Sequence, residues 1–501
     1  MKILLFFLSI IFTFFSCHQP INKQAPATLS TGINAVAQKL SVKSMQDDLL
    51  ILWSAIREMH PAYGIYTSAD SLQKVYDKTY SSITGPLYEG EFINHVYPFL
   101  CDLRCGHTQL RHSVQYKPSG VSQEPHLPFE VLVRHHRAWI TTHLTEKLHT
   151  GDEIISMNGI PVAEIINHGY DLYCGDGYNE TFKELYLSEY DGFEDACYIY
   201  YRWTPPYHIT LRTGAGALKT FQLDLPAAGS ALQPAQEKKT DNYAGWTGAK
   251  NTDYLPLRFL KGSSTALFEV KSYQYTDTVI YKEAFRQIHQ RGIKNLIIDL
   301  RHNTGGDIRI AAKLVSYLAD SPFHIIREMK SRIPNPAVNH FAKYFDTART
   351  ESFNLGFKPG YSEGDYYHID FKPVFGLSNG PIPLDKTAHF SGKLFVLIDG
   401  ATFSSGAHTA AAIKAQCKNV QFIGRETAGA EEGCSGGTIQ RLTLPNTGVV
   451  VEFPWMRVVS VARNPVFGRG IMPDHMVEYS PEEVVSGADP DLKKVLSLIR
   501  R

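Results

Sequence analysis

Apolar residues recur every three or four positions in the first part of the chain, as one face of a helix requires. The first such segment ends at Pro61, which cannot continue a helix. The helices predicted in this way cover residues 44–59, 71–82 and 89–103. We therefore expect an N-terminal helical domain at residues 40–115.

Farther along, apolar and polar residues alternate, which is typical of half-buried strands. The segments "LPFEVLVRHHRAWITTHL" and "EIISM" both show it, and Asn158-Gly159 after the second favours a two-residue hairpin turn. Residues 118–230 are therefore predicted to form a second, β-rich domain. The segment 230–251 is rich in Ala, Gly, Lys and Gln, so we interpret it as a linker.

From residue 252 the pattern becomes strand, helix, strand. The apolar strand "KNLIIDL" lies between a helix near 279–291 and another after Gly306. Such alternation indicates an α/β layer, so the predicted fold class is α/β within an α+β multidomain chain. We place this domain at residues 252–480 and a C-terminal helix at 481–501. Residues 323–392 have no clear period and are interpreted as an insertion.

The chain begins with one lysine and an apolar run that is too short to span a bilayer but suits an export signal. Residues 1–17 are thus a predicted signal peptide. Their end, "FFSC", resembles the lipobox of bacterial lipoproteins, which implies lipidation of Cys17 and a lipid anchor in the bacterial cell envelope, on its periplasmic or surface face. Secretion after an ordinary signal peptide and an uncleaved anchor are the alternatives. The polar residues 18–39 are predicted to be a flexible tether.

Composition narrows the classes of function. Apolar residues make up 43% and charged residues 20%, as in a folded protein, and Lys+Arg and Asp+Glu each total 50. Without a basic excess, no nucleic-acid partner is expected. Export would allow the six remaining cysteines to pair. Cys101, Cys105 and His107 have a zinc-like spacing but no second ligand pair nearby, so we prefer buried free thiols and predict no metal.

Two glycines follow the buried strand in "LIIDLRHNTGGD". Gly305 and Gly306 precede a predicted helix, where backbone N–H groups can point into a cavity and bind a developing oxyanion. A tight turn that uses left-handed glycines explains the same residues equally well.

The segment "DGATFSSGAHTAAAIK" has the same strand-turn-helix form. Ser404 at the start of the helix could attack a carbonyl carbon while the Ser405 N–H binds the oxyanion. A plain N-cap serine is the alternative. A serine nucleophile needs a base, and His107 in "CDLRCGHTQL" offers an imidazole. It is one of 20 histidines, so its position alone does not single it out.

Together with two further segments, these motifs resemble the S41 peptidases, the tail-specific or C-terminal processing proteases, and in particular their tricorn-like branch. "DLRHNTGG" is similar to "DLR-x-N-x-GG", "TFSSG" to "T-x-S-x-x-E", and "IGRETAG" to "GE-x-TAG". "GRGIMPD" is similar to "G-x-G-(I/V)-x-PD" and "CGHT" to "DGHT". The motifs keep the family's order from Cys105 to Asp474.

The resemblance implies a crotonase-like α/β catalytic core preceded by a PDZ-like domain. It makes Ser404 the nucleophile, with Ser405 as the alternative, and His107 the general base. The N–H groups of Gly305, Gly306 and Ser405 would form the oxyanion hole. The implied reaction is hydrolysis of peptide bonds in peptides or unfolded proteins through an acyl-enzyme, without a cofactor.

The chain departs from the family at three positions. Ala430 replaces the lysine of members with a Ser-Lys pair, and Ala407 replaces the motif glutamate. Phe467 occupies the position of the glutamate that orients the histidine in tricorn-like members. The carboxylates that could substitute are Glu431, Glu432 and Glu452. These departures leave a second hypothesis open, a catalytically decayed peptide-binding scaffold, and a third, an esterase, for which the G-x-S-x-G elbow is lacking.

Overall fold

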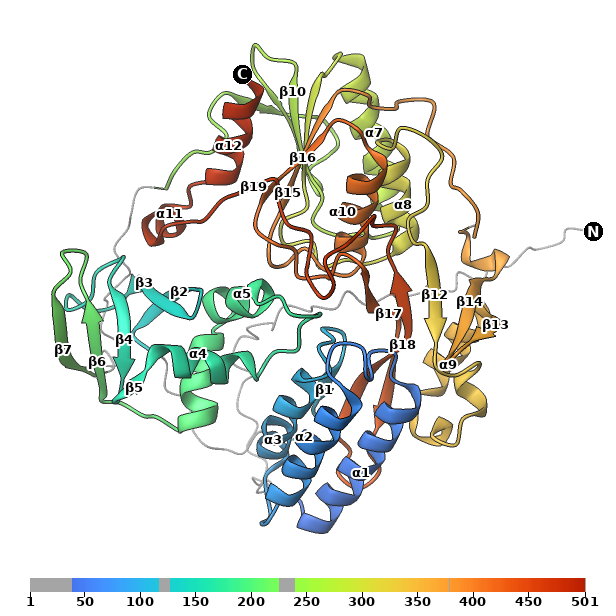
Figure 1. Cartoon of the computed structure of the whole chain (residues 1–501). Helices are drawn as coiled ribbons and strands as arrows, with labels where there is room; N and C mark the ends of the chain where they lie inside the picture. The colour runs from blue at the N-terminus through green and yellow to red at the C-terminus, as the bar shows by residue number, and fades with distance from the viewer. Residues whose placement is uncertain (1–37, 117–126, 225–238, 378, 501) are drawn as a thin grey trace, which may run out of the picture.

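The computed structural model describes residues 38–116, 127–224, 239–377 and 379–500 (Figure 1). The predicted signal peptide, the lipidation site Cys17 and all but two residues of the predicted tether lie outside these ranges. Among the residues that are described, none of the helices has the length and apolar character needed to cross a membrane.

The three N-terminal helices predicted from the apolar spacing are confirmed. They are α1 (Val42–Met59), α2 (Ala69–Ser82) and α3 (Glu89–Cys101). The hydroxyl of Ser41 caps α1 by accepting the N–H of Ser44 at 3.1 Å, which satisfies one of the free donors of the first turn.

An antiparallel sheet follows, in the order β2-β3-β4-β6-β7 with β5 paired to β4. Asn158 and Gly159 have positive φ angles of 48° and 82° and turn the chain from β4 to β5, as predicted. Helices pack on this sheet and complete one apolar core, and we call the unit the β2–β7 domain. Its strands are β2 (Phe129–Arg134), β3 (Arg137–His143), β4 (Glu153–Met157), β5 (Ile160–Pro161), β6 (Tyr207–Arg212) and β7 (Leu218–Leu223), and its main helices are α4 (Val162–Tyr170), α5 (Thr181–Glu189) and α6 (Gly192–Asp195).

The predicted α/β layer contains a seven-stranded sheet in the order β19-β16-β15-β11-β10-β9-β8. The strands from β19 to β10 are parallel neighbours, and β9 and β8 are antiparallel. The strands are β8 (Trp246–Gly248), β9 (Leu257–Leu260), β10 (Thr265–Glu269), β11 (Asn295–Asp299), β15 (Lys393–Ile398), β16 (Val420–Gly424) and β19 (His475–Met476). The predicted linker at 230–251 is therefore wrong where β8 forms the sheet edge. Buried Trp246 anchors that strand.

Helices cover both faces of this sheet (Figure 1). Leu296 and Ile298 of β11 face α7 (Asp277–Gln290), α8 (Ile308–Ser316) and α10 (Ser405–Gln416), whereas Ile297 faces α12 (Pro490–Ile499). The single C-terminal helix predicted at 481–501 is in fact two, because the chain turns at Gly487 between α11 (Pro481–Ser486) and α12.

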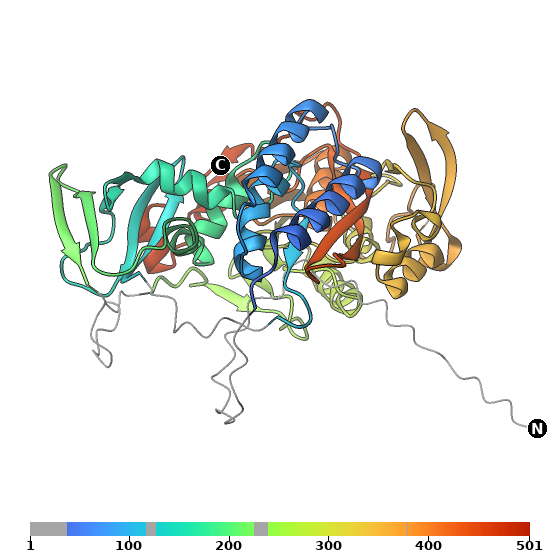
Figure 2. The ribbon, with the colours of Figure 1, turned by 90° about the horizontal axis from the view of Figure 1, so that it is seen from below.

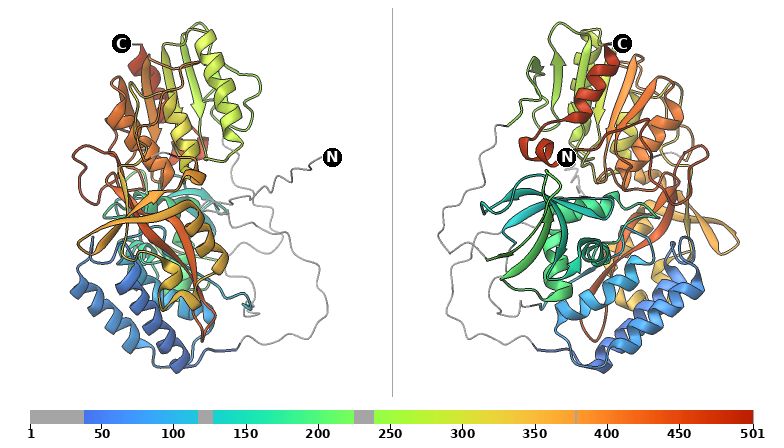
Figure 3. Two further views of the ribbon diagram at one scale, coloured as in Figure 1. Left: turned by 90° about the vertical axis from the view of Figure 1, so that its right-hand side faces the viewer. Right: turned by 60° about the vertical axis from the view of Figure 1, so that its left-hand side comes forward.

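A third sheet lies between the α/β layer and the N-terminal helices (Figure 3). Its order is β1-β18-β12-β14-β13, with β17 also paired to β18. Its strands are β1 (Gln109–Arg111), β12 (Glu328–Ser331), β13 (Phe357–Glu363), β14 (Tyr366–Phe371), β17 (Gly433–Thr443) and β18 (Val450–Val459). The aperiodic insertion thus supplies three of these strands and the helix α9 (Thr347–Gly356).

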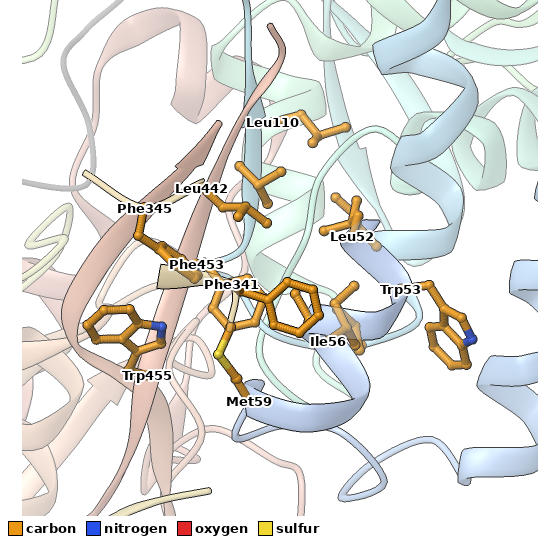
Figure 4. Packing of buried hydrophobic residues seen from close by; sticks show 14 of the residues in the cluster. Leu52, Trp53, Ile56, Met59, Leu110, Phe341, Phe345, Leu442, Phe453 and Trp455 are labelled. Carbon is orange, nitrogen blue, oxygen red and sulfur yellow. The ribbon is translucent and has the colours of Figure 1, made fainter. Parts of the chain in front are cut away.

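The N-terminal helices do not have a core of their own. Ile56 and Met59 of α1 pack in one cluster with Phe345 of the insertion and Phe453 and Trp455 of β18 (Figure 4). The helical domain predicted at 40–115 is therefore one layer of a larger unit. In Figure 2 these helices lie between the β2–β7 domain and the β13–β14 hairpin.

Candidate active site

Two strand-turn-helix units meet at one edge of the seven-stranded sheet. β11 and β15 are parallel and in register from Asn295 opposite Lys393 to Asp299 opposite Leu397, so the chain leaves both strands at the same end. The turn after β11 carries Gly305 and Gly306, and the turn after β15 carries Ser404. A Cβ added at Gly305 would lie 2.8 Å from the Ser404 Cβ. The two turns are therefore in contact, and this contact requires glycine.

Ser404 lies at the N-terminus of α10 in a strained conformation. Its φ of 51° and ψ of −124° are unfavourable for a residue with a Cβ. Such strain persists only where the surroundings enforce it, and it is concentrated at active sites. The Ser404 Oγ lies 3.0 Å from Nε2 of His107, which is hydrogen-bond distance.

The neighbouring Ser405 is directed elsewhere. Its hydroxyl donates to the Gly306 carbonyl at 2.8 Å, and the residue is only 7% exposed. Of the two serines considered as nucleophile, Ser404 is the one that the structure places against the histidine.

The three backbone N–H groups proposed for the oxyanion hole differ in whether they already donate a hydrogen bond within the protein. The Gly305 N–H donates to Asn303 Oδ1 at 2.9 Å, so it is used inside its own loop. Asn303 is itself held, because its Nδ2 donates to the Val270 carbonyl at 2.8 Å. Gly306 and Ser405 both line the cavity at Ser404, so their N–H groups are the better candidates for the oxyanion hole.

His107 comes from the loop between α3 and β1 and is 3% exposed. Its ring stacks on Phe403, with the ring centroids 4.5 Å apart and the planes inclined by 28°. The backbone of Gly436 also lies close to the ring, since a Cβ added at this glycine would be only 3.2 Å from it. Beside it, the Thr108 hydroxyl and His60 Nε2 are 2.7 Å apart. The imidazole is thus packed into one orientation next to the serine.

The position at which the family places the orienting glutamate does not supply a carboxylate. Phe467 is 54% exposed and lies in an aromatic cluster, 5.3 Å from Tyr66 and 6.2 Å from Tyr178 between ring centroids.

The three glutamates considered as substitutes have other partners. Glu431 pairs with Lys414 at 2.8 Å, and Glu452 pairs with Arg111 at 3.2 Å. Glu432 accepts the Tyr66 hydroxyl at 2.8 Å.

A different carboxylate, that of Asp176, lies near His107, although no sequence motif pointed to it. One ring nitrogen of His107, the Cys105 Sγ and one Asp176 carboxylate oxygen lie within 4.8 Å of one another, and all three residues are buried. Asp176 Oδ1 accepts the Gly106 N–H at 2.8 Å, whereas Oδ2 has no hydrogen-bond partner in the part of the chain that is described. Burial raises the pKa of Asp176 to about 7.

The ligand types of this trio would also suit a transition metal, but not in the arrangement considered from the sequence. Cys101 lies apart from the trio, with its Sγ 3.6 Å from that of Cys174. None of the six described cysteines forms a disulfide, in agreement with the preferred interpretation. Burial and the nearby Asp176 raise the pKa of the Cys105 thiol to about 12.

A cavity of about 500 Å³ opens at Ser404 and His107. Much of its lining comes from the insertion. Its larger apolar side chains include Met329, Phe353, Phe357, Phe371, Phe375 and Met456. A serine hydroxyl and an imidazole thus line a pocket rich in apolar side chains, which suits attack on a carbonyl group beside an apolar side chain.

Comparison with known proteins agrees with this geometry. Residues 264–477 match the family model of peptidase family S41. The chain carries an S41 peptidase domain. The matched segment runs from β10 into the loop after β19 and contains Ser404 and both turns, whereas His107 and Asp176 precede it. No protein with curated annotation matches the sequence.

Solved structures with the same fold extend the similarity beyond the S41 domain. Mature CPAF complexed with lactacystin is 16% identical, with 91% of this chain and 98% of that chain covered and a TM-score of 0.58. A mutant form of CPAF is 14% identical, with 91% and 96% covered and a TM-score of 0.59. The family match confirms the resemblance of the motifs to the S41 peptidases and supports a serine peptidase activity for the chain.

Proposed function

We propose that this protein is a serine endopeptidase in which Ser404 is the nucleophile and His107 the general base. The observation that supports it most directly is the 3.0 Å contact between Ser404 Oγ and His107 Nε2. A hydroxyl becomes a nucleophile when a base accepts its proton as it attacks, and an imidazole is matched to this task near neutral pH.

In acylation, the Ser404 oxygen would bond to the scissile carbonyl carbon while its proton passes to His107 Nε2. The negative charge that develops on the carbonyl oxygen would be bound by the N–H groups of Gly306 and Ser405. The tetrahedral intermediate would then break its C–N bond, and His107 would return the proton to the leaving amine. In deacylation, water would lose a proton to His107 as its oxygen attacks the ester carbonyl carbon. The C–O bond to Ser404 would then break, and His107 would return the proton to the Ser404 oxygen.

The substrate is expected to be an extended peptide or unfolded protein. The apolar cavity beside Ser404 would accommodate an apolar side chain next to the scissile bond. We infer that the β2–β7 domain is PDZ-like, since its β4–β5 hairpin carries the expected Asn158-Gly159 turn. A domain of that type could bind a peptide by adding it to a sheet edge.

A fluorophosphonate probe tests the nucleophile, because it forms a bond to an activated serine oxygen with loss of fluoride. Wild type and Ser405→Ala should be labelled at Ser404, and Ser404→Ala should not be labelled. Hydrolysis of a quenched fluorescent peptide should follow the same order. Peptide binding with neither labelling nor hydrolysis in the wild type would instead favour the decayed scaffold.

We also propose that the protein is exported and anchored to the bacterial envelope through a lipid on Cys17. The support is the apolar segment before that cysteine and its similarity to a lipobox. In cells fed an alkyne fatty acid, the wild type should incorporate the label and sediment with membranes. Cys17→Ala should lose both properties, and an equally labelled Cys17→Ala would refute the assignment.

A further inference from the structure

We propose that Asp176 is the carboxylate that orients His107, taking the role that the family assigns to a glutamate at the position of Phe467. This inference rests on the proposed Ser404–His107 peptidase. It concerns a positioning residue, because Asp176 would act through the imidazole and not on the substrate.

The role proposed for Asp176 rests on what each of the two imidazole nitrogens must do. Nε2 faces the Ser404 hydroxyl at 3.0 Å. For Nε2 to accept that proton, the ring's own proton must be on Nδ1, and a carboxylate near Nδ1 stabilises this tautomer and the imidazolium that forms during attack. In the described part of the chain, a carboxylate oxygen of Asp176 lies within 4.8 Å of a ring nitrogen of His107. Its Oδ2 is buried and has no hydrogen-bond partner among the described residues.

The loop that carries Asp176 is held on two sides of the active site. The Gly106 N–H donates to Asp176 Oδ1 at 2.8 Å, and the Gly177 N–H donates to the Arg104 carbonyl at 3.1 Å. Asn179 Nδ2 donates to the Ala428 carbonyl of the S41 domain at 2.8 Å. The carboxylate is therefore fixed relative to both the loop of His107 and the domain of Ser404, as a positioning group requires.

The neighbouring groups of Asp176 determine the pH at which its carboxyl group ionises. The titratable and charged groups that face it are His107 and Cys105 on the adjoining loop, Tyr66 after α1, Glu432 before β17 and Arg457 on β18. Burial raises its pKa to about 7, while the Gly106 N–H and Arg457 oppose this shift. Below that pH the side chain is neutral and cannot stabilise an imidazolium. Activity should therefore rise as the pH increases through about 7.

The test compares Asp176→Asn with a matched control, Asp277→Asn. Asp277 at the start of α7 is also a buried aspartate, with one oxygen bound to a backbone N–H at 2.7 Å and the other without a partner among the described residues. Burial raises its pKa to about 6. It does not line the cavity at Ser404. The two substitutions thus remove similar charges, one beside His107 and one outside the active site.

We expect Asp176→Asn to lower kcat by roughly 10²- to 10⁴-fold with little change in KM. It should also move the rise of kcat/KM near pH 7 to lower pH, because the imidazolium loses a stabilising carboxylate, whereas Asp277→Asn should keep both the rate and the profile. Wild-type kcat and an unchanged pH profile in Asp176→Asn would overturn the inference. Equal losses and unchanged profiles in both variants would also overturn it. If the fluorophosphonate probe does not label the wild type, the proposed peptidase function itself is refuted.

A measurement on the unmodified protein covers the case in which Asp176→Asn does not fold. In protein labelled with ¹⁵N-histidine, the His107 signals can be assigned by their absence in His107→Gln. At pH 8 the Nδ1 signal should be that of a protonated ring nitrogen and the Nε2 signal that of an unprotonated one, and this pattern should persist in the presence of EDTA. The opposite tautomer, or a pattern that EDTA changes, would contradict an orienting carboxylate.

Discussion

The two sides of the active site are built in different ways. The nucleophile side comes from two neighbouring strand-turn-helix units of one sheet, β11 to α8 and β15 to α10. The base side combines His107, which follows α3, with Asp176, which lies between α4 and α5, and Gly106 and Asp176 are 70 positions apart in the sequence. A local motif therefore supplies the nucleophile, whereas only the tertiary fold brings the base and its carboxylate together.

This difference predicts how each side responds to substitution. On the nucleophile side, geometry is set by backbone contacts between two turns, so a small steric change should be felt directly. On the base side, geometry depends on a side chain that is packed against Phe403 and approached by a buried carboxylate. There, changes of charge should matter more than changes of volume.

The largest effect is expected from His107→Gln, which removes the base but keeps a polar side chain. We expect kcat to fall by at least about 10³-fold, because members of such a catalytic set act as a unit. Steady-state hydrolysis of the quenched peptide measures the loss.

The control for that substitution is His408→Gln. His408 is also buried and lines the cavity, but its Nε2 lies 3.6 Å from the Cys434 Sγ and burial lowers its pKa to about 4. Its replacement should lower kcat at least tenfold less than His107→Gln. A comparable loss in both variants would mean that the loss in His107→Gln does not single out His107 as the base.

The sequence was informative where the signal is local. The buried strand before Asp299 and the run of small residues after Ser404 mark two strand-turn-helix units, and the structure contains both. His107 was identified only through the resemblance of "CGHT" to a family motif. Asp176 belonged to none of the motifs, and its carboxylate is recognisable only once the loop around it is seen to fold onto Gly106.

The strands that the sequence pattern does not predict have a similar explanation, because their signal is weak in the local sequence. β8 lies in the segment whose composition suggests a linker, and only Trp246 of its three residues is buried, so the strand shows no alternation. In β13, Phe357 is buried and the following six residues are exposed, which hides that strand in the same way. Edge strands with few buried side chains leave little periodicity in a sequence, whereas the central strands are recognisable by their apolar runs.

An intermediate effect is expected from Gly305→Ala on the nucleophile side. Gly305 has a φ of 105°, and a Cβ there would lie 2.8 Å from the Ser404 Cβ and 2.9 Å from the Ser405 nitrogen. The turn must shift, and Ser404 with it, so we expect kcat to fall roughly 10- to 100-fold, since small displacements at a catalytic centre have effects of this size.

Gly262→Ala is the control for that backbone effect. Gly262 also has a positive φ, of 69°, but nothing lies within 4 Å of an added Cβ. It should lose about 1 kcal/mol of stability from the left-handed conformation and retain its kcat. Hydrolysis and thermal unfolding of both variants separate the two effects, and full activity of Gly305→Ala would show that the contact between the turns is not needed.

The smallest effect concerns stability on the base side. The pKa of Asp176 rises from its ordinary value of 3.8 to about 7 in the folded protein. Because the folded state resists ionisation, the stabilisation due to the neutral carboxyl is complete below pH 3.8 and is lost as the pH rises through about 7. The shift corresponds to about 4 kcal/mol at most. Asp176→Asn cannot ionise, so between pH 4 and pH 8 its midpoint of thermal unfolding should rise relative to wild type. A constant difference between the two proteins across this range would mean that Asp176 does not titrate there.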